Sequence, residues 1–382
     1  MSRRRATLWR LLTASSWRTL GLQLTALALA AAAGALLFAW LGFAPIAASS
    51  GHWPVTSWLL HFAMRNSVEL RAHAVSDPPD LQDPALVKRG AGHYATACVS
   101  CHGAPGQTPA VTTRRMTPPP PLLLSRIPAW RDRELFWIVR HGVKFTAMPA
   151  WPTSQRDDEV WAMVAFLRRL PALPASEWRA LTQPPDARPP ALQQLKEPVR
   201  TALTRCASCH GYDGIGRYDE FPRLAGQREA YLLATLHAYR EGRRHSGFMQ
   251  VAAAEPDSAI LGELVAWYAS RTGPVRNEHA AARDPSAVAR GRELALAGAE
   301  LDGIPACADC HGPAGHQRNE RYPLLAGQPA GYLERQLELL ATGRRGGTSY
   351  AHIMQTIARR LSPAQRSDVA AFYASLEFDA PG

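Results

Sequence analysis

No cysteine of this 382-residue chain is left over for a disulfide, because all six lie in three copies of one short pattern. A disulfide-stapled secreted scaffold and a lone cysteine nucleophile are therefore excluded. The chain also lacks any run of alternating apolar and polar residues long enough to predict a strand or hairpin. Its mean hydropathy of −0.20 excludes a polytopic membrane protein but leaves room for a single anchor.

The chain has fewer acidic than basic residues, 32 against 43, so its formal net charge is +11. Part of this excess lies at the N-terminus, ahead of any acid. The remainder carries a moderate basic excess without the basic and aromatic patch typical of nucleic-acid binding, so we expect no nucleic-acid partner. The N-terminal arginines are Arg3, Arg4, Arg5, Arg10 and Arg18.

An uncharged stretch, residues 20–44, follows the arginines. About 20 apolar residues in a helix span the hydrocarbon core of a bilayer. Arginines ahead of the span and few basic residues after it predict a cytoplasmic N-terminus over residues 1–19. The sequence thus predicts a single-pass anchor over residues 20–44 in a bacterial cytoplasmic membrane, with the remaining chain in the periplasm.

A cleaved signal peptide is the alternative, since small residues ahead of Ser49 form a possible cleavage site. Signal-peptide apolar cores are usually shorter, about 7–15 residues, which favours a retained anchor. Both interpretations export the downstream chain. In the juxtamembrane segment 45–80, the aromatic stretch 52–64 is too short to span. It predicts either a helix at the membrane surface or a helix buried against the first domain.

The six cysteines form three Cys-x-x-Cys-His sequences, each followed by glycine. This spacing is the attachment signature of c-type haem. Two thiols add across the porphyrin vinyl groups as thioethers, and the adjacent histidine supplies the proximal ligand of the iron. The sequence therefore predicts three covalently bound haems c. The predicted attachment residues are Cys98, Cys101 and His102; Cys206, Cys209 and His210; and Cys307, Cys310 and His311.

Two other interpretations of the paired cysteines have less support in the sequence. A four-cysteine zinc site needs two pairs that meet, whereas these pairs lie about 100 residues apart and each has its own histidine. A thioredoxin-like redox pair needs a βαβ setting, for which the sequence gives no sign.

The chain repeats around the second and third motifs. LAGQ at 224–227 recurs as LAGQ at 325–328, and AWYAS at 266–270 recurs as AFYAS at 371–375. The two units are therefore tandem copies. The helix ahead of Cys206 is predicted to be short, because few residues separate it from the proline-rich stretch before it.

The first unit is a more distant copy, in which DPALVKRG at 83–90 resembles DPSAVARG at 284–291. Aspartate followed by proline favours an N-cap and a first helical residue. Each unit predicts a helix, the haem motif, glycine- and proline-rich loops and a closing amphipathic helix, so the expected fold class is all-α. The predicted domains are 81–170, 199–271 and 284–378, with a semi-extended linker at 171–198 and closing helices that include 157–169, 257–270 and 363–376.

Methionine is scarce, at seven residues, and its placement predicts the distal ligands of the irons. Met249 is the only methionine between the second and third motifs, and Met354 is the only one after the third. Met148 holds the same place in the first unit, late in the loop ahead of the closing helix. A thioether ligand raises the reduction potential of a haem. The predicted ligand pairs are His102 with Met148, His210 with Met249, and His311 with Met354.

Other side chains compete for the distal positions. Met116 precedes the proline run of the first unit, and Met163 lies within the closing helix, where gap-filling in the core is the more frequent use of methionine. The alternative nitrogen ligands, whose use would lower the potential, are His141, His237, His245 and His352.

Residues 199–376 resemble the dihaem cytochrome c4 type. The resemblance lies in FPRLAGQREAYL with Met249 and in YPLLAGQPAGYL with Met354. The first unit, with GVKFTAMPAWP, resembles a single class I cytochrome c domain, and similar domains occur in subunits of terminal oxidases and membrane dehydrogenases. The whole chain is similar to an anchored trihaem cytochrome c, with three tandem class I domains after a transmembrane helix.

The resemblance implies electron transfer between respiratory-chain partners. It implies a donor and an acceptor protein, such as a quinol-linked dehydrogenase or a haem-copper oxidase. In the alternative interpretation the chain is itself the cytochrome subunit of such a complex. A haem enzyme, such as a peroxidase or a sulfur-compound dehydrogenase, needs an iron with an open sixth position, which three methionine candidates disfavour. We therefore expect an electron carrier without a catalytic residue of its own.

Overall fold

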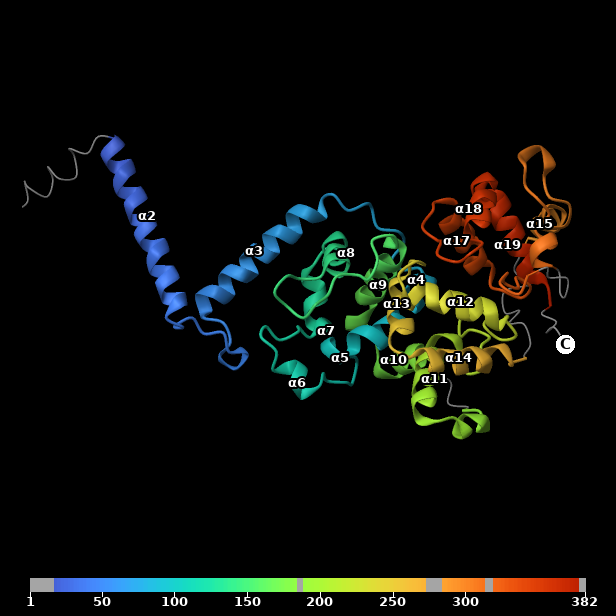
Figure 1. Cartoon of the computed structure of the whole chain (residues 1–382), viewed down its shortest axis with the longest axis horizontal. Coiled ribbons are helices and arrows are strands. Elements are labelled where there is room, and N and C mark those ends of the chain that lie inside the picture. Colours follow the sequence, from blue (N-terminus) through green and yellow to red (C-terminus); the bar gives the residue numbers. More distant parts are fainter. Residues whose placement is uncertain (1–16, 184–187, 273–283, 313–318, 378–382) are drawn as a thin grey trace, which may run out of the picture. The chain divides into compact units, whose positions relative to one another are not determined.

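The computed structural model describes residues 17–183, 188–272, 284–312 and 319–377 (Figure 1). Throughout these ranges the regular structure is helical, and the only β-type pairs are two isolated bridges. The all-α prediction is confirmed. The predicted cytoplasmic segment 1–19 lies mostly outside the described residues. The chain divides into two units, residues 1–57 with 116–118 and residues 58–115 with 119–382.

The first unit holds the long apolar helix α2 (Trp17–Trp40). Its stretch Thr19–Trp40 has a mean hydropathy of 2.0, is exposed along its length, and is long and apolar enough to cross a membrane. The helix ends four residues earlier than the predicted span 20–44, because the chain turns at Leu41 and Gly42. The short helix η1 (Ala48–Ser50) follows.

Helix α3 (Pro54–Ala72) is longer than the aromatic stretch 52–64 that predicted it. The large apolar side chains of its first half are exposed, and its buried residues, Val68 and Ala72, lie beyond that stretch. Arg65 donates a hydrogen bond to the carbonyl of Ala129 at 3.3 Å. The buried alternative therefore describes the second half of α3 and not residues 52–64.

Three modules follow in the second unit, and we number them in chain order. The first module carries its haem motif on the π-helical turn η2 (Tyr94–Cys98) and on α5 (Val99–His102). Its closing helix α9 (Asp157–Arg169) has the predicted bounds. The remaining elements are α4 (Pro84–His93), α6 (Val111–Arg114), α7 (Leu123–Arg126), η3 (Ile127–Ala129), α8 (Asp132–His141), η4 (Leu170–Ala172) and α10 (Ala175–Thr182).

The predicted semi-extended linker 171–198 is wrong over much of its length. Helix α10 buries Trp178, whose ring lies 5.8 Å from that of Tyr94 and 5.9 Å from that of Phe166. The short helix η5 (Pro190–Gln194) buries Leu192 in the core of the second module. Prolines that seemed to mark an extended connector instead stand at the starts of these two helices, where the missing N–H costs nothing.

The second module consists of α11 (Glu197–His210), α12 (Glu229–Arg240), α13 (Gly247–Ala254) and α14 (Ser258–Ala269). Helix α11 begins at Glu197, so the part ahead of Cys206 is short, as predicted, and the helix continues without a break through the haem motif to His210. The closing helix α14 begins one residue after the capping side chain of Asp257, which accepts a hydrogen bond from the Ile260 amide at 2.8 Å.

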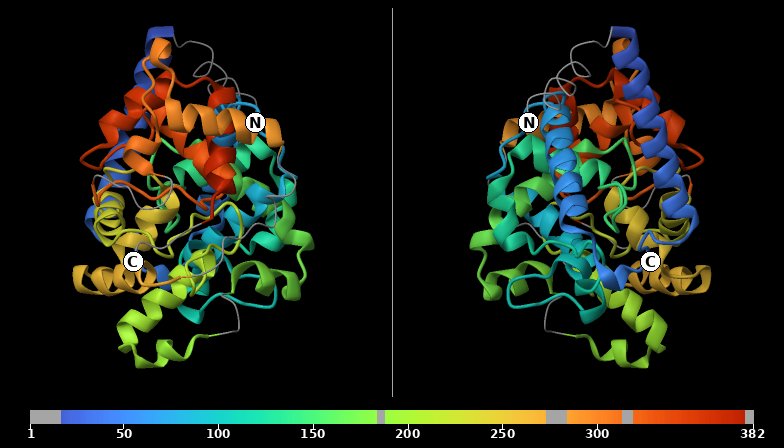
Figure 2. Two further views of the ribbon diagram at one scale, coloured as in Figure 1. Left: turned by 90° about the vertical axis from the view of Figure 1, so that its right-hand side faces the viewer. Right: turned by 90° about the vertical axis from the view of Figure 1, so that its left-hand side faces the viewer.

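The third module repeats this order. Its helices, drawn in orange and red, lie together in Figure 1 and in both turned views of Figure 2. Its closing helix ends one residue before the predicted bound. The elements are α15 (Pro285–Ala297), η7 (Glu300–Asp302), α16 (Ala308–His311), α17 (Ala330–Ala341), α18 (Ala351–Arg360) and α19 (Pro363–Ser375).

The repeated Asp-Pro sequences start the first helices of modules one and three, as predicted. The Asp83 carboxylate accepts a hydrogen bond from the Ala85 amide at 2.8 Å, and that of Asp284 accepts from the Ser286 amide at 2.9 Å. Each cap satisfies an amide that the helix itself leaves unpaired.

Candidate haem-binding sites

Each histidine of the three motifs is oriented by a proline carbonyl. The Nδ1 atoms of His102, His210 and His311 lie 2.9, 3.2 and 2.9 Å from the carbonyl oxygens of residues in the loop that follows. A carbonyl only accepts, so Nδ1 carries the proton and Nε2 keeps its lone pair, which is the arrangement of an iron-ligating imidazole. The three carbonyls belong to Pro121, Pro222 and Pro323.

Burial favours the neutral form of these rings. It lowers the pKa of His102 and of His311, and it lowers the pKa of His210 to about 4. The hydrogen bond to the proline carbonyl acts in the opposite direction in each case. A neutral imidazole is the form that binds a metal.

The helix that carries each motif ends at its histidine, and a glycine follows. Gly103, Gly211 and Gly312 have φ values of 71°, 73° and 71°, a left-handed conformation that a side chain would strain. This turn directs the chain away from the motif so that the proline carbonyl reaches the ring. In the first two modules a buried tyrosine hydroxyl, of Tyr94 or Tyr268, donates to the carbonyl of that glycine at 2.7 and 3.1 Å.

The six cysteines are half-buried, and none is in a disulfide. Burial raises the pKa of Cys98 and Cys206 to about 12 and that of Cys307 to about 11, so these thiols have little nucleophilic thiolate. Within the described residues no three His, Cys, Asp or Glu side chains form a group that could hold a metal ion. The donor set of each motif, two thiols and an oriented imidazole, fits haem c.

The three predicted distal ligands are half-buried and precede the closing helices. Met148 lies in a loop, where its amide donates to Thr146 Oγ1 at 3.1 Å. The loop prediction is wrong for the other two, because Met249 lies in the first turn of α13 and Met354 is the fourth residue of α18. The cap at Ser246 starts α13, and its hydroxyl accepts a hydrogen bond from the Met249 amide at 3.2 Å.

The competing side chains fall in other surroundings. Met163 is 2 % exposed in the core of the first module, as expected for gap-filling. Met116 belongs to the other unit of the chain. His245 Nδ1 lies 3.3 Å from Thr153 Oγ1, and the His141 ring packs 4.8 Å from that of Trp137. His237 is half-buried on α12, and His352 is exposed on α18.

The repeated LAGQ sequences have a role that their repetition alone does not reveal. The Gln227 amide bonds both the carbonyl and the amide of Leu324, at 3.1 and 2.9 Å. The Gln328 amide does the same to Arg223, at 2.8 and 3.0 Å. Each glutamine thus pairs with the residue that follows the ring-orienting proline of the other module. This reciprocal contact joins the second and third modules next to both haem motifs.

A second repeated sequence, Gly-Arg-Arg at 242–244 and at 343–345, also joins these two modules. Arg244, which is 3 % exposed, donates to Gln336 Oε1 at 3.3 Å, and Arg345 donates to the Tyr231 hydroxyl at 3.3 Å. The sequence alone does not show this role of the arginines, because each donor lies in one repeat and its acceptor lies in the other.

The comparisons with known proteins agree with this arrangement. Residues 85–167 match the family described as cytochrome c oxidase, cbb3-type, subunit III. Residues 199–258 and 288–377 match the cytochrome c family. The second and third modules thus match one family, and the first matches a different one, in keeping with its more distant sequence.

Curated relatives match the C-terminal half. The thiosulfate dehydrogenase electron acceptor of Thiomonas intermedia is 37% identical over 171 residues, which cover 44% of this chain and 77% of the relative. Cytochrome c4 of Pseudomonas aeruginosa is 36% identical over 167 residues, 44% of this chain and 79% of the relative. The cytochrome c4 structure from Acidithiobacillus ferrooxidans is 33% identical, with a TM-score of 0.40, and covers 45% of this chain and 98% of that one.

The matched residues include the motifs and the LAGQ sequences of the last two modules and the closing helix α19 of the third. The resemblance that the sequence suggested is therefore confirmed: the chain is an electron-transfer protein of the cytochrome c family, and its C-terminal half is of the tandem cytochrome c4 type.

Proposed function

We propose that the chain holds three haems c, one in each module, and passes single electrons between redox proteins at the periplasmic face of the cytoplasmic membrane. The observation that supports this most strongly is the shared geometry of His102, His210 and His311, whose Nδ1 atoms all point to a proline carbonyl. Haem c supplies the one-electron chemistry when bound. The chain orients the proximal ring, excludes water and places a methionine on the distal side.

The residues proposed to hold the groups are those of the three motifs, with Met148, Met249 and Met354 as distal ligands. Each Cys-x-x-Cys pair supplies the two thioether links, and the histidine supplies Nε2. The proposed haem domains are 81–170, 199–271 and 284–378, although the first core extends to Trp178 on α10.

A pyridine haemochrome assay on the purified full chain is expected to give three haems per chain. The haem should remain on the protein after denaturation and acid–acetone extraction, because thioether bonds are covalent. Replacing both cysteines of one motif with alanine should lower the count to two. A wild-type count of two, or extraction of the haem, contradicts the proposal.

We propose that helix α2 is a retained membrane anchor. The stretch Thr19–Trp40 is apolar, exposed and long enough to span, and it is longer than the apolar core of a usual signal peptide. Membranes washed with carbonate are expected to retain the full-length protein. A soluble form that starts near Ser49 would show instead that α2 is part of a cleaved signal peptide.

A second candidate is a subunit role within a larger complex. It is favoured by the match of the first module to subunit III of a cbb3-type oxidase and by relatives named as electron acceptors of thiosulfate dehydrogenase. Under this proposal a membrane dehydrogenase or a haem-copper oxidase is the partner. Purification in mild detergent tests it, since a subunit should elute with stoichiometric partner chains and a free carrier should elute alone.

A further inference from the structure

The first module contacts the second at the turn that carries Met249. Glu159, on the closing helix α9 of the first module, is 1 % exposed. Its carboxylate accepts hydrogen bonds from the Ser246 hydroxyl and the Gly247 amide, both at 2.6 Å. These donors belong to the second module, more than 80 positions away along the chain. A buried carboxylate with two partners from another module is a specific contact, because unpaired burial of a charge is costly.

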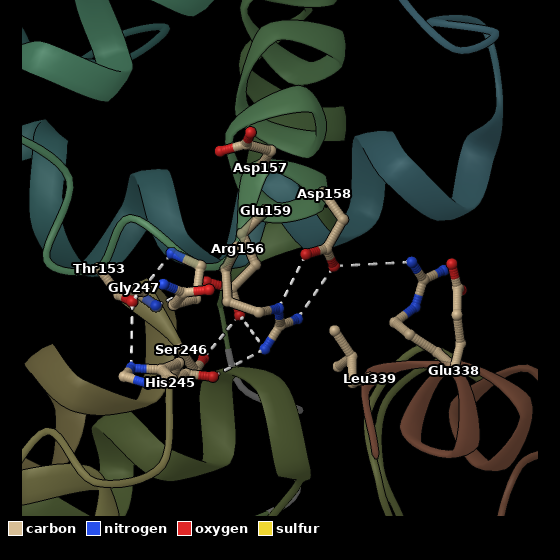
Figure 3. A network of polar contacts seen from close by, with 12 residues as sticks. Thr153, Arg156, Asp157, Asp158, Glu159, His245, Ser246, Gly247, Glu338 and Leu339 are labelled. Carbon is tan, nitrogen blue, oxygen red and sulfur yellow. Dashed lines mark hydrogen bonds and ion pairs between the residues drawn. The ribbon is translucent and has the colours of Figure 1, made fainter. Parts of the chain in front are cut away.

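An arginine balances the buried charge. Arg156 forms an ion pair with Glu159 at 2.9 Å and also donates to the carbonyl of His245 at 3.1 Å (Figure 3). Its remaining donors bond Asp158, which also pairs with Arg89 at 3.0 Å. Burial raises the pKa of Glu159, and the charge of Arg156 acts in the opposite direction. Both oxygens of the buried Glu159 carboxylate therefore have partners, and its charge is balanced by Arg156.

The contact continues to the predicted iron ligand through one residue. Ser246 donates to Glu159, and its oxygen accepts the hydrogen bond from the Met249 amide at 3.2 Å. The same hydroxyl is the N-cap of α13. Loss of an N-cap destabilises the first turn of a helix, because an amide there loses its hydrogen-bond partner. Glu159 thus fixes the rotamer of the side chain that begins the Met249 helix.

Two more contacts hold the same turn against the first module. The Phe248 ring stacks on that of His93 at 4.6 Å and packs on Trp151 at 5.7 Å. Gly247 lies so close to Trp151 that any Cβ added there would overlap the indole. Trp151 follows Met148 by three residues, so the loop that carries Met148 contacts the first turn of α13, which carries Met249.

The first module also reaches the attachment side of the second haem site. A Cβ added at Gly92 of α4 would lie 2.8 Å from the Sγ atom of Cys209 and 3.5 Å from the ring of Phe221. The first module therefore contacts the second both at a cysteine of the haem motif and at the turn that carries Met249.

We propose that Glu159 is a positioning residue for the second haem site: by holding Ser246 and Gly247 it makes methionine ligation of the second iron depend on docking of the first module. The inference rests on the proposed function, in particular on Met249 as the distal ligand. It gives the first module a structural task for the second iron besides carrying a haem of its own.

The test compares full-length variants in detergent. Glu159→Ala removes both acceptors and leaves the Ser246 hydroxyl, the Gly247 amide and Arg156 without their partner. We expect the far-red sulfur-to-iron band of the oxidised protein to lose about a third of its intensity, one iron of three, and reduced protein to gain one carbon monoxide site. Redox titration should show one potential lowered and two unchanged. A general folding defect would not lower one reduction potential while leaving the other two unchanged.

Two further variants sharpen the comparison. Glu177→Ala is the matched control, since Glu177 of the first module has a 41% exposed side chain and pairs with Arg169 at 3.2 Å. All three readouts should stay at the wild-type level. Ser246→Ala removes only the hydroxyl between Glu159 and the Met249 amide, and it should reproduce the Glu159→Ala signature. If Glu159→Ala does not accumulate as a folded protein, Ser246→Ala tests the proposal in its place.

The outcomes separate the inference from the proposed function. A wild-type protein without the far-red band overturns methionine ligation itself, and with it the proposed ligand set. A full band in the wild type that persists at full intensity in Ser246→Ala and in folded Glu159→Ala overturns the positioning role alone. A loss confined to one haem in both variants, with Glu177→Ala unchanged, supports it.

Discussion

Replacing Gly291 with alanine is expected to destabilise the third module by about 3 kcal/mol, because α15 and α19 cross with no room for a side chain. A Cβ added at Gly291 would overlap the carbonyl oxygen of Asp368 and lie 3.0 Å from Phe372 Cβ. The obstacle is mainly backbone, which cannot rotate away as a side chain can. Gly90 meets the carbonyl of Ala162 in the same way where α4 crosses α9, so Gly90→Ala should destabilise the first module similarly.

Thermal unfolding of the haem-loaded chain, followed by circular dichroism, measures this effect. A loss of about 3 kcal/mol lowers the Tm of a module of this size by roughly 10 °C or more. Gly262→Ala, at a helical glycine of α14 whose added Cβ would meet nothing within 4 Å, is the control. It should stabilise the second module by about 0.5–1 kcal/mol, because alanine is the better helix former. Equal Tm values for Gly291→Ala and the wild type would show that the crossing can open without cost.

Replacing Met249 with alanine is expected to remove the distal ligand of the second iron completely. Met249 lies half-buried in the first turn of α13, and no other methionine lies between the second and third motifs. Because the proposed function gives each module the ligands of its own iron, the far-red band should lose about a third of its intensity while the other two irons keep their spectra. Reduced protein should gain a carbon monoxide site that the wild type lacks.

Met116→Ala is the matched control, since Met116 is 38% exposed and lies in the other unit of the chain. The far-red band and all three potentials should then stay as in the wild type. If Met249→Ala leaves the band at full intensity, the second iron has another ligand, and His237 or His245 becomes the preferred one. If Met116→Ala removes part of the band, Met116 and not Met148 ligates the first iron.

The sequence by itself determined those features that depend on neighbouring residues. The Cys-x-x-Cys-His motifs, the aspartate caps and the bounds of the closing helices depend on residues within a few positions of one another, and short-range geometry is encoded by short-range patterns. The repetition of Asp-Pro and glycine at 83–90 and 284–291 pointed to related first helices. The crossings of α4 with α9 and of α15 with α19 explain why glycine stands at the end of these two sequences.

Contacts between distant residues were decided only in the tertiary structure. The sequence stretch 171–198 carries no helical periodicity. Its residues Trp178 and Leu192 are nevertheless buried, Trp178 in the core of the first module and Leu192 in that of the second. The glutamines of LAGQ and the carboxylate of Glu159 find their partners about 90 to 100 positions away, and no spacing rule connects such residues. Docking of one module on another depends on which surfaces match in shape and charge, and this match exists only after each module has folded.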